Sequence, residues 1–153
     1  PLSYREAIMS DAISTYMTAD HRHCDHYLAN FEQAVDRGEW DAAGTSGQDL
    51  SESLLRHFAR EEEKLFPDLL ALDPRARGPV QVMTMEHRQM RALLDELREA
   101  LGGRDAKACL GLVETLHFLI QQHNAKEEGI LYPLADQGLA TQAEELVAEL
   151  KAF

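Results

Sequence analysis

The chain has 153 residues, 44% of them hydrophobic and 27% charged, a balance typical of a globular protein with a buried core. Its formal net charge of −12 at pH 7 argues against nucleic acids and anionic membranes as partners, because both attract clusters of Lys and Arg. No apolar run is long enough to span a membrane, and no basic-then-apolar signal opens the sequence. We therefore expect one domain over residues 1–153, located in the cytoplasm, with its two cysteines reduced.

Apolar residues at helical spacing predict a first long helix that starts near Ser10 and ends at Gly38. A short capping-box turn is expected before it, at Ser3–Glu6. The stretch 39–47 contains two glycines and lacks a regular pattern, so it predicts an irregular connection. The second long helix becomes clear by Leu50.

Pro67 is expected to break or kink the second helix, because a proline inside a helix loses a hydrogen bond and clashes with the preceding turn. The Pro- and Gly-containing stretch 73–78 predicts the central connection. Pro79 suits the first turn of a third long helix, and Gly102-Gly103 predicts its end.

Asp105 is expected to cap a fourth long helix, whose inward residues include Ile130 and which Pro133 should break. A second capping box at Thr141–Glu144 opens a short C-terminal helix that ends near Lys151. Long helices with short connections favour antiparallel neighbours. The predicted fold class is therefore all-α: an antiparallel up-down-up-down four-helix bundle with a short C-terminal helix.

The sequence repeats itself with an offset of 66 residues. The segment 57–67 reads HFAREEEKLFP, and the segment 123–133 reads HNAKEEGILYP. A second repeated motif reads Met-Thr, any residue, an acid, His and Arg. It spans residues 17–22 and again residues 83–88. A fixed internal period reports repeated architecture. It predicts two similar helix pairs related by a pseudo-twofold axis.

Ionisable residues occupy six inward positions of the predicted helices: His21, His57, Glu61, His87, His123 and Glu127. Burying polar groups without partners costs about 1–3 kcal/mol each, so a cation is expected among them. Residues four apart on a helix lie about 5–6 Å apart on one face, which lets each His-x-x-x-Glu pair share a site. Mixed imidazole and carboxylate donors suit iron, manganese or zinc. The sequence therefore predicts a metal centre.

Together these motifs resemble the hemerythrin-like HHE cation-binding domain family, over roughly residues 10–133. The resemblance implies a non-haem di-iron centre in a four-helix bundle, with two iron ions bridged by oxo, hydroxo or water. Zinc or manganese remains an alternative. The resemblance further implies four terminal ligands, His21, His57, His87 and His123, and two bridging ligands, Glu61 and Glu127.

The sequence departs from the oxygen-carrying members of that family at two positions. Those proteins carry a second histidine one turn after the third-helix ligand, where this chain has Arg91. They also place an aspartate five residues after the last histidine, where this chain has Glu128. The repeat favours Glu127 as the ligand instead, because it lies 66 residues after Glu61. Fewer histidines leave more open metal positions, which argues against simple oxygen carriage.

The expected function is therefore binding or sensing of a small ligand such as oxygen, nitric oxide or hydrogen peroxide. One alternative is a di-iron enzyme of the peroxidase or nitric oxide reductase type. Another is an iron-sensing or metal-handling module that binds a protein partner. A structural zinc bundle is disfavoured, because structural zinc sites are normally closed. Whether the protein is an enzyme stays open at this point.

The two halves differ one turn past His21, where Cys24 and Asp25 correspond to Met90 and Arg91. Cys24 is interpreted as a small buried hydrophobic residue. We expect any difference in openness between the two metal positions at this end of the bundle. Three further acids beside the repeated motifs are interpreted as solvated or outer-layer charges: Glu62, Glu63 and Glu128.

Overall fold

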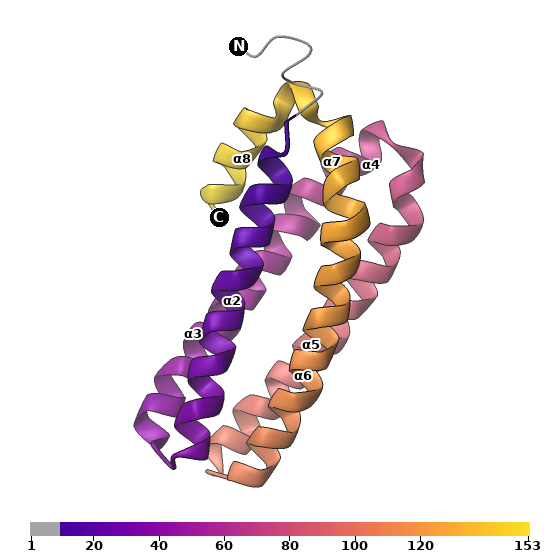
Figure 1. The fold of residues 1–153 in the computed structure, drawn as a ribbon. Coiled ribbons are helices and arrows are strands. Elements are labelled where there is room, and N and C mark those ends of the chain that lie inside the picture. The colour runs from indigo at the N-terminus through magenta and orange to yellow at the C-terminus, as the bar shows by residue number, and fades with distance from the viewer. Residues whose placement is uncertain (1–9) are drawn as a thin grey trace.

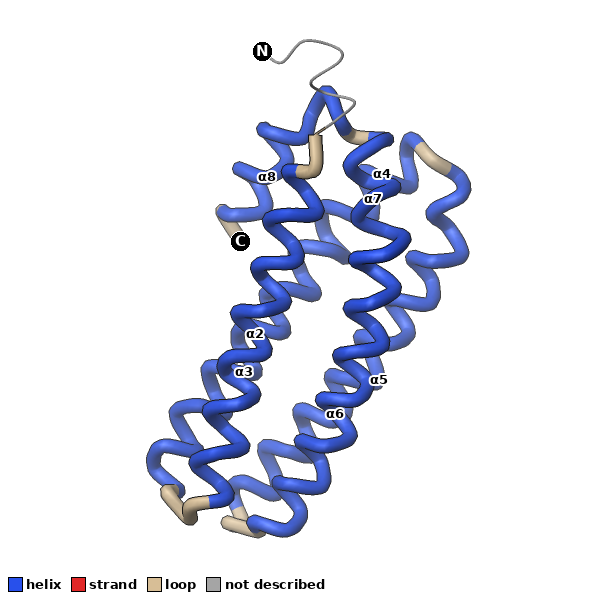
Figure 2. The backbone as a smooth tube through the Cα atoms, in the orientation of Figure 1, coloured by secondary structure: helices blue, strands red, loops and turns tan. Residues whose placement is uncertain are grey.

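The structure is a computed structural model that describes residues 10–153, and every regular element in that range is helical. It contains four long helices: α2 (Ala12–Asp36), α3 (Trp40–Arg60), α5 (Arg77–Gly102) and α6 (Ala106–Lys126). They lie side by side along one long axis, and short connections join them at the ends (Figure 1, Figure 2). The all-helical fold class is therefore confirmed. The turn predicted at Ser3–Glu6 lies outside the described residues.

Shorter helices complete one end of the molecule. After five-residue π-helical turns, α3 and α6 continue as two short helices, and a last helix follows. These are α4 (Phe66–Leu72), α7 (Tyr132–Gly138) and α8 (Ala143–Lys151). The π-helical turns are Glu61–Leu65 and Glu127–Leu131, and two 3-10 turns follow at Pro74–Ala76 and Ala140–Gln142. Helix α8 lies beside the start of α2 (Figure 1).

A residue distant in sequence holds the start of α2. The helix begins at Ala12 rather than Ser10, and Asp136 of α7 accepts hydrogen bonds from the backbone N–H groups of Ile13 (3.1 Å) and Ser14 (3.2 Å). These are two of the N–H groups that a helix cannot satisfy itself. The predicted end is confirmed, because Gly38 adopts a φ of 68°, the left-handed conformation that glycine tolerates.

The prediction of an irregular stretch at 39–47 is wrong, since α3 already begins at Trp40. Glycine lowers helix propensity, which is why the local pattern suggested a loop. Tertiary packing overrides it at Gly47, where an added Cβ would lie 3.1 Å from the Phe31 ring. The missing side chain lets α3 approach α2 closely at this level.

Neither Pro67 nor Pro133 ends its helix, so the break predicted at each proline is wrong, while the kink given as the alternative at Pro67 stays a prediction. Each proline is the second residue of a new α-helical segment, a position that needs no backbone N–H from it. The π-helical turn before it makes the transition, because Phe66 N–H donates to the Glu61 carbonyl and Tyr132 N–H to the Glu127 carbonyl, five residues back. The helix therefore changes hydrogen-bond pattern instead of ending.

This π-helical turn also shifts which residues face inward. Ile130, predicted to be an inward residue, is 53% exposed, whereas Leu131 is 2% exposed. A π turn holds more residues than an α turn, so positions after Glu127 rotate relative to an α-helical pattern. The prediction for Ile130 is wrong for this reason.

The connection between the halves is shorter than predicted. After Asp73 the chain forms the 3-10 turn, and α5 begins at Arg77, which puts Pro79 inside its first turn. Gly102 is the last residue of α5, as the glycine pair predicted.

The predicted caps of the last two helices have opposite outcomes. Asp105 caps α6 by accepting a hydrogen bond from Ala108 N–H at 3.0 Å, as predicted. The capping box at Thr141–Glu144 is wrong, because Thr141 lies in a 3-10 turn and α8 begins at Ala143 without a side-chain cap.

A polar layer divides the core into two apolar clusters. One cluster fills the end that holds the α2–α3 and α5–α6 connections, and includes Leu28, Phe31, Leu54 and Leu116. The other fills the end with α4, α7 and α8, and includes Met17, Leu69 and Leu146. Cys24 and Cys109 are both buried and free. No helix within residues 10–153 has the length and apolar character needed to cross a membrane.

Candidate metal centre

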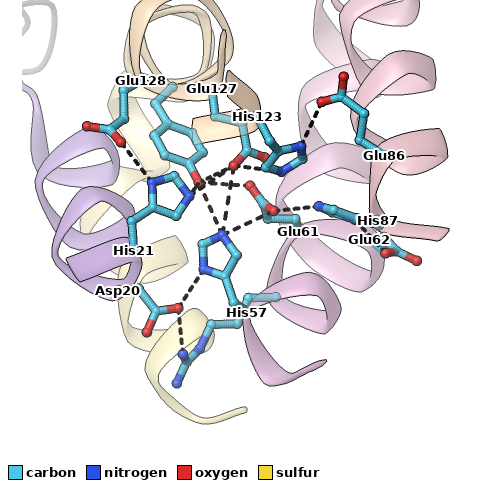
Figure 3. Close-up of polar contacts among 12 residues, drawn as sticks. Asp20, His21, His57, Glu61, Glu62, Glu86, His87, His123, Glu127 and Glu128 are labelled. Carbon is cyan, nitrogen blue, oxygen red and sulfur yellow. Dashed lines mark hydrogen bonds and ion pairs between the residues drawn. The ribbon is translucent and has the colours of Figure 1, made fainter. Parts of the chain in front are cut away.

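The polar layer contains all six ionisable residues that the sequence placed inward. Their exposed fractions are 4% or less: His21, His57, Glu61, His87, His123 and Glu127. Each long helix contributes one histidine, and each glutamate is the first residue of a π-helical turn. Figure 3 shows these side chains pointing toward one another from different helices. The local cause is the i, i+4 spacing, which carries His57 and Glu61 to the same face.

Each histidine has a carboxylate on its outer side. His57 Nδ1 donates to Asp20 Oδ2 at 2.7 Å, and His123 Nδ1 donates to Glu86 Oε1 at 3.0 Å. The other two rings bind carboxylates one residue after the inward glutamates (Figure 3), at 3.0 Å for His21 with Glu128 and 2.6 Å for His87 with Glu62. An ionised carboxylate only accepts hydrogen bonds, so each Nδ1 must carry the proton.

The inner nitrogens therefore present lone pairs to the centre when the rings are neutral. His57 Nε2 lies 3.3 Å and His87 Nε2 lies 3.1 Å from the same oxygen, Glu61 Oε1. His21 Nε2 lies 3.0 Å and His123 Nε2 lies 3.1 Å from Glu127 Oε1. Acceptors this close repel each other unless a cation lies among them. The geometry therefore requires either bound protons or a bound metal.

The pKa values of the metal-free site reflect this need for bound protons or a bound metal. Burial alone would lower the pKa of His57, but the Glu61 charge and bonds to Asp20 and Glu127 raise it well above its ordinary value. Burial likewise opposes the charged form of His87, yet Glu61 and Glu62 raise the pKa of this ring. Burial would raise the pKa of Glu127, but hydrogen bonds with Glu61 and the surrounding histidines hold it well below its usual range.

Four buried side-chain atoms among the described residues have no hydrogen-bond partner: Glu61 Oε1, His87 Nε2, His123 Nε2 and Glu127 Oε2. Three of them lie about 3.1 Å from another donor of the cluster: Glu61 Oε1, His87 Nε2 and His123 Nε2. Such atoms are rare in native structures, and each needs an explanation such as an ion. The donor set of imidazole nitrogens and carboxylate oxygens suits a divalent or trivalent transition metal.

The donors form two groups that can each hold a metal ion, with ligand atoms within 4.8 Å of one another. One group is Glu61, His87, His123 and Glu127, and the other is His21, His57 and Glu127. Glu127 belongs to both. Each group draws donors from both halves of the chain, so neither half builds a site alone.

Positive side chains hold three of the outer carboxylates. Arg60 Nη1 lies 2.9 Å from Asp20 Oδ2, and its repeat equivalent Lys126 pairs with Glu86. Arg91 Nη2 lies 2.9 Å from Glu62 Oε2. The repeat equivalent of Arg91 is Asp25, whose pKa is raised by burial. The halves therefore differ in charge at this pair of positions.

Tyr132 was not among the predicted site residues, but it lies in the polar layer. Its ring is fully buried, and Oη lies 2.8 Å from Glu61 Oε2, 3.1 Å from Glu127 Oε1 and 3.0 Å from His21 Nε2. Burial and the charges of Glu127 and Glu61 raise the pKa of this phenol well above its ordinary value when no metal is bound. Tyr132 follows Glu127 by five residues, and an α-helical period does not place those positions on one face. The preceding π-helical turn does so.

The roles of Asp20 and Glu86 were not predicted, whereas Glu62 and Glu128 take the outer-layer role that was one of the alternatives expected for them. Asp20 and Glu86 stand in the repeat directly before an inward histidine, and Glu62 and Glu128 stand directly after an inward glutamate. The repetition of acids at these four positions is the sequence signal that could have identified the outer carboxylates. The remaining acid beside the motifs, Glu63, is exposed, in accord with the solvated role expected for it.

The sequence model of the Hemerythrin HHE cation binding domain family matches residues 12–135 of this chain. That range covers α2 to the middle of α7 and therefore every residue of the polar layer. The chain belongs to this family. Comparison with curated proteins and with solved structures gave no match.

Proposed function

We propose that this protein is a non-haem di-iron protein that binds or senses a small ligand: oxygen, nitric oxide or hydrogen peroxide. The proposed ligands are the four inner histidine nitrogens, with Glu61 and Glu127 as bridges. In this proposal the four long helices form an antiparallel up-down-up-down bundle, with a pseudo-twofold axis between the two helix pairs. The bound irons would supply redox chemistry and open coordination positions.

One observation carries the proposal. Four histidine Nε2 atoms and two carboxylate oxygens converge within 3.0–3.3 Å with acceptor facing acceptor. A metal resolves this repulsion without protonating the rings. The outer carboxylates then fix each ring by its Nδ1–H, the arrangement that metal-binding histidines commonly have.

Two ions are favoured over one because the donors form two groups that share Glu127. Glu61 Oε1 also faces a histidine of each group, His57 at 3.3 Å and His87 at 3.1 Å. A carboxylate between two sets of imidazoles is placed to bridge two ions. Iron is preferred to zinc, because structural zinc sites are closed and this donor set leaves positions for an exogenous ligand.

The chain's own residues would favour binding of such a ligand in two ways. Apolar side chains exclude water from the His87 ring, since the Phe58 ring stacks on it with centroids 4.2 Å apart and the Phe66 ring stacks at 6.1 Å. The Glu62 carboxylate keeps the proton on His87 Nδ1, so that the inner nitrogen stays available. A dry, preorganised pocket strengthens electrostatic interactions with a bound ligand.

Metal analysis with optical spectroscopy tests the proposal. We expect about two irons per chain and a near-ultraviolet charge-transfer band that changes when azide is added. The matched control is the double variant His57→Ala/His123→Ala, which removes one terminal nitrogen from each group and should bind less iron. Zinc as the bound metal, or an iron spectrum that ignores azide, would contradict the proposal.

Turnover separates ligand binding from catalysis. Steady consumption of hydrogen peroxide or nitric oxide by the iron-loaded protein would identify the alternative, a di-iron enzyme. Metal-dependent capture of a protein partner without turnover would instead indicate an iron-sensing or metal-handling module. Reversible binding of the small ligand with neither effect is the result that the primary proposal expects.

A further inference from the structure

The internal repeat is inexact at the aromatic residue that follows each inward glutamate by five residues, and this difference makes the two metal positions unequal. The six proposed ligands match in pairs 66 residues apart, and so do the outer carboxylates. Tyr132, however, corresponds to Phe66. Both rings are buried beside a histidine: the Phe66 ring stacks on His87 with centroids 6.1 Å apart, and the Tyr132 ring stacks on His21 at 5.5 Å. The two positions thus differ by one hydroxyl.

That hydroxyl points into the donor group that has fewer members. Tyr132 Oη lies 3.0 Å from His21 Nε2, 3.5 Å from His57 Nε2 and 3.1 Å from Glu127 Oε1, the three residues of the smaller group. The other group has four donors, because Glu61 joins His87, His123 and Glu127. A phenol oxygen added to the smaller group brings both groups to four.

Hydrogen bonding alone does not account for these contacts. A phenol carries one proton, and its shortest contact, to Glu61 Oε2 at 2.8 Å, uses it. The remaining contacts then bring the oxygen lone pairs of Tyr132 against the nitrogen lone pairs of His21 and His57 and an oxygen of Glu127. This is the same crowding of acceptors that marks the histidine nitrogens as metal donors.

We infer that Tyr132 is a ligand to the metal ion held by His21, His57 and Glu127. The inference rests on the proposed di-iron function. On binding, the phenol O–H bond breaks as the oxygen–metal bond forms, and the proton is released to the solvent. With the smaller group completed by a protein oxygen, the two irons have different ligand sets. The phenolate then distinguishes the ion beside His21 from the ion beside His87, where Phe66 offers no oxygen.

Spectroscopy of the iron(III)-loaded protein tests this inference without depending on activity. Phenolate bound to iron(III) absorbs visible light by charge transfer and gives resonance-enhanced tyrosine ring vibrations. We expect both signals in the wild-type protein, and a shift of the vibrations when the protein contains ring-deuterated tyrosine. This measurement uses the unaltered chain, so a folding defect cannot obscure it.

Two variants complete the experiment. Tyr132→Phe should abolish the visible band while the iron content stays near two per chain, whereas Tyr27→Phe, a tyrosine outside the donor groups, should keep it. Wild-type protein with two irons and no phenolate signal overturns this inference and leaves the proposed function intact. A band that persists in Tyr132→Phe also overturns it. Failure to bind iron at all overturns both proposals, and metal analysis distinguishes that case.

Discussion

At the scale of single residues, the inner histidines are held by carboxylates that come from other helices. Asp20 on α2 binds the outer nitrogen of His57 on α3, and Arg60 holds Asp20 in turn. Glu86 on α5 does the same for His123 on α6, with Lys126 in place of Arg60. Each ring is thereby fixed in the tautomer and orientation that a metal needs.

Replacement of Asp20 by Asn should therefore weaken metal binding about 10- to 100-fold, the usual cost of losing an outer partner of a metal-binding histidine. The amide keeps the size of the carboxylate but loses the charge that fixes the proton on His57 Nδ1. Competition with a chelator of known affinity measures the change. Asp36→Asn, an exposed acid at the end of the same helix, is the control. Equal affinity in both variants would refute the role assigned to Asp20.

The raised pKa values of His57 and His87 predict how the metal-free protein responds to pH. A group whose pKa is higher in the folded state stabilises that state below its unfolded pKa, and this contribution is lost as the pH rises through the folded value. The metal-free protein should therefore lose stability from neutral toward alkaline pH. A bound metal replaces these protons, so the stabilisation that metal adds should grow over the same range.

Thermal unfolding at a series of pH values, with chelator or with saturating metal, checks this prediction. The difference in Tm between the two conditions should widen as the pH increases. Direct titration of an unbuffered sample should also show protons released when metal binds. A constant difference in Tm, or metal binding without proton release, would count against it.

At the scale of elements, the two π-helical turns decide what the helices present to the core. Each begins at a proposed bridging glutamate and ends just before a buried aromatic residue, Phe66 or Tyr132. Single π-helical turns inside α-helices often occur at functional sites. The i, i+4 spacing keeps His123 and Glu127 on one face, and the π-helical turn brings Tyr132 to that face, which an unbroken α-helix does not do.

The second π-helical turn determines which side chains are buried after Glu127, and substitutions can test this. Leu131→Ala should lower the free energy of unfolding by about 2–5 kcal/mol, because it leaves a cavity at a buried position. Ile130→Ala should change it by no more than about 0.5 kcal/mol, since that side chain is mostly exposed. Urea unfolding of both variants in the presence of metal measures the two effects. The reverse order would show an uninterrupted α-helical register.

At the scale of the whole molecule, the metal centre joins the two halves of the chain. One donor group takes His87, His123 and Glu127 from the second half with Glu61 from the first. The other takes His21 and His57 from the first half with Glu127 from the second. The layer also separates two apolar clusters, so protein packing and metal binding support each other.

Metal removal should therefore destabilise the whole fold rather than one helix. Binding to the folded state alone stabilises it by about 2.7 kcal/mol when the free metal is 100 times its Kd. Calorimetry of the metal-loaded and chelated protein measures the loss as a lower Tm, with readdition of metal as the control for reversibility. An unchanged Tm would show that the folded chain does not need the metal.

Much of this protein was predictable from local sequence patterns. Helical spacing of apolar residues gave the long helices, and the 66-residue repeat with its i, i+4 pairs gave the six buried ionisable residues of the centre. These features are local because side-chain direction along an α-helix repeats at a fixed period. The stop of α2 before Gly38 and the cap at Asp105 were also predictable, since each depends on one residue's own backbone or side chain.

Tertiary structure alone decided the features that depend on contacts between distant segments. The start of α3 near two glycines follows from packing against α2, and the start of α2 is held by Asp136, more than 120 residues away. The π-helical turns continue both helices through prolines that the local rule treats as breakers. They also bring Tyr132 inward. Packing on both sides of the turn favours hydrogen bonds between residues five apart over the usual four. No local sequence period encodes this preference.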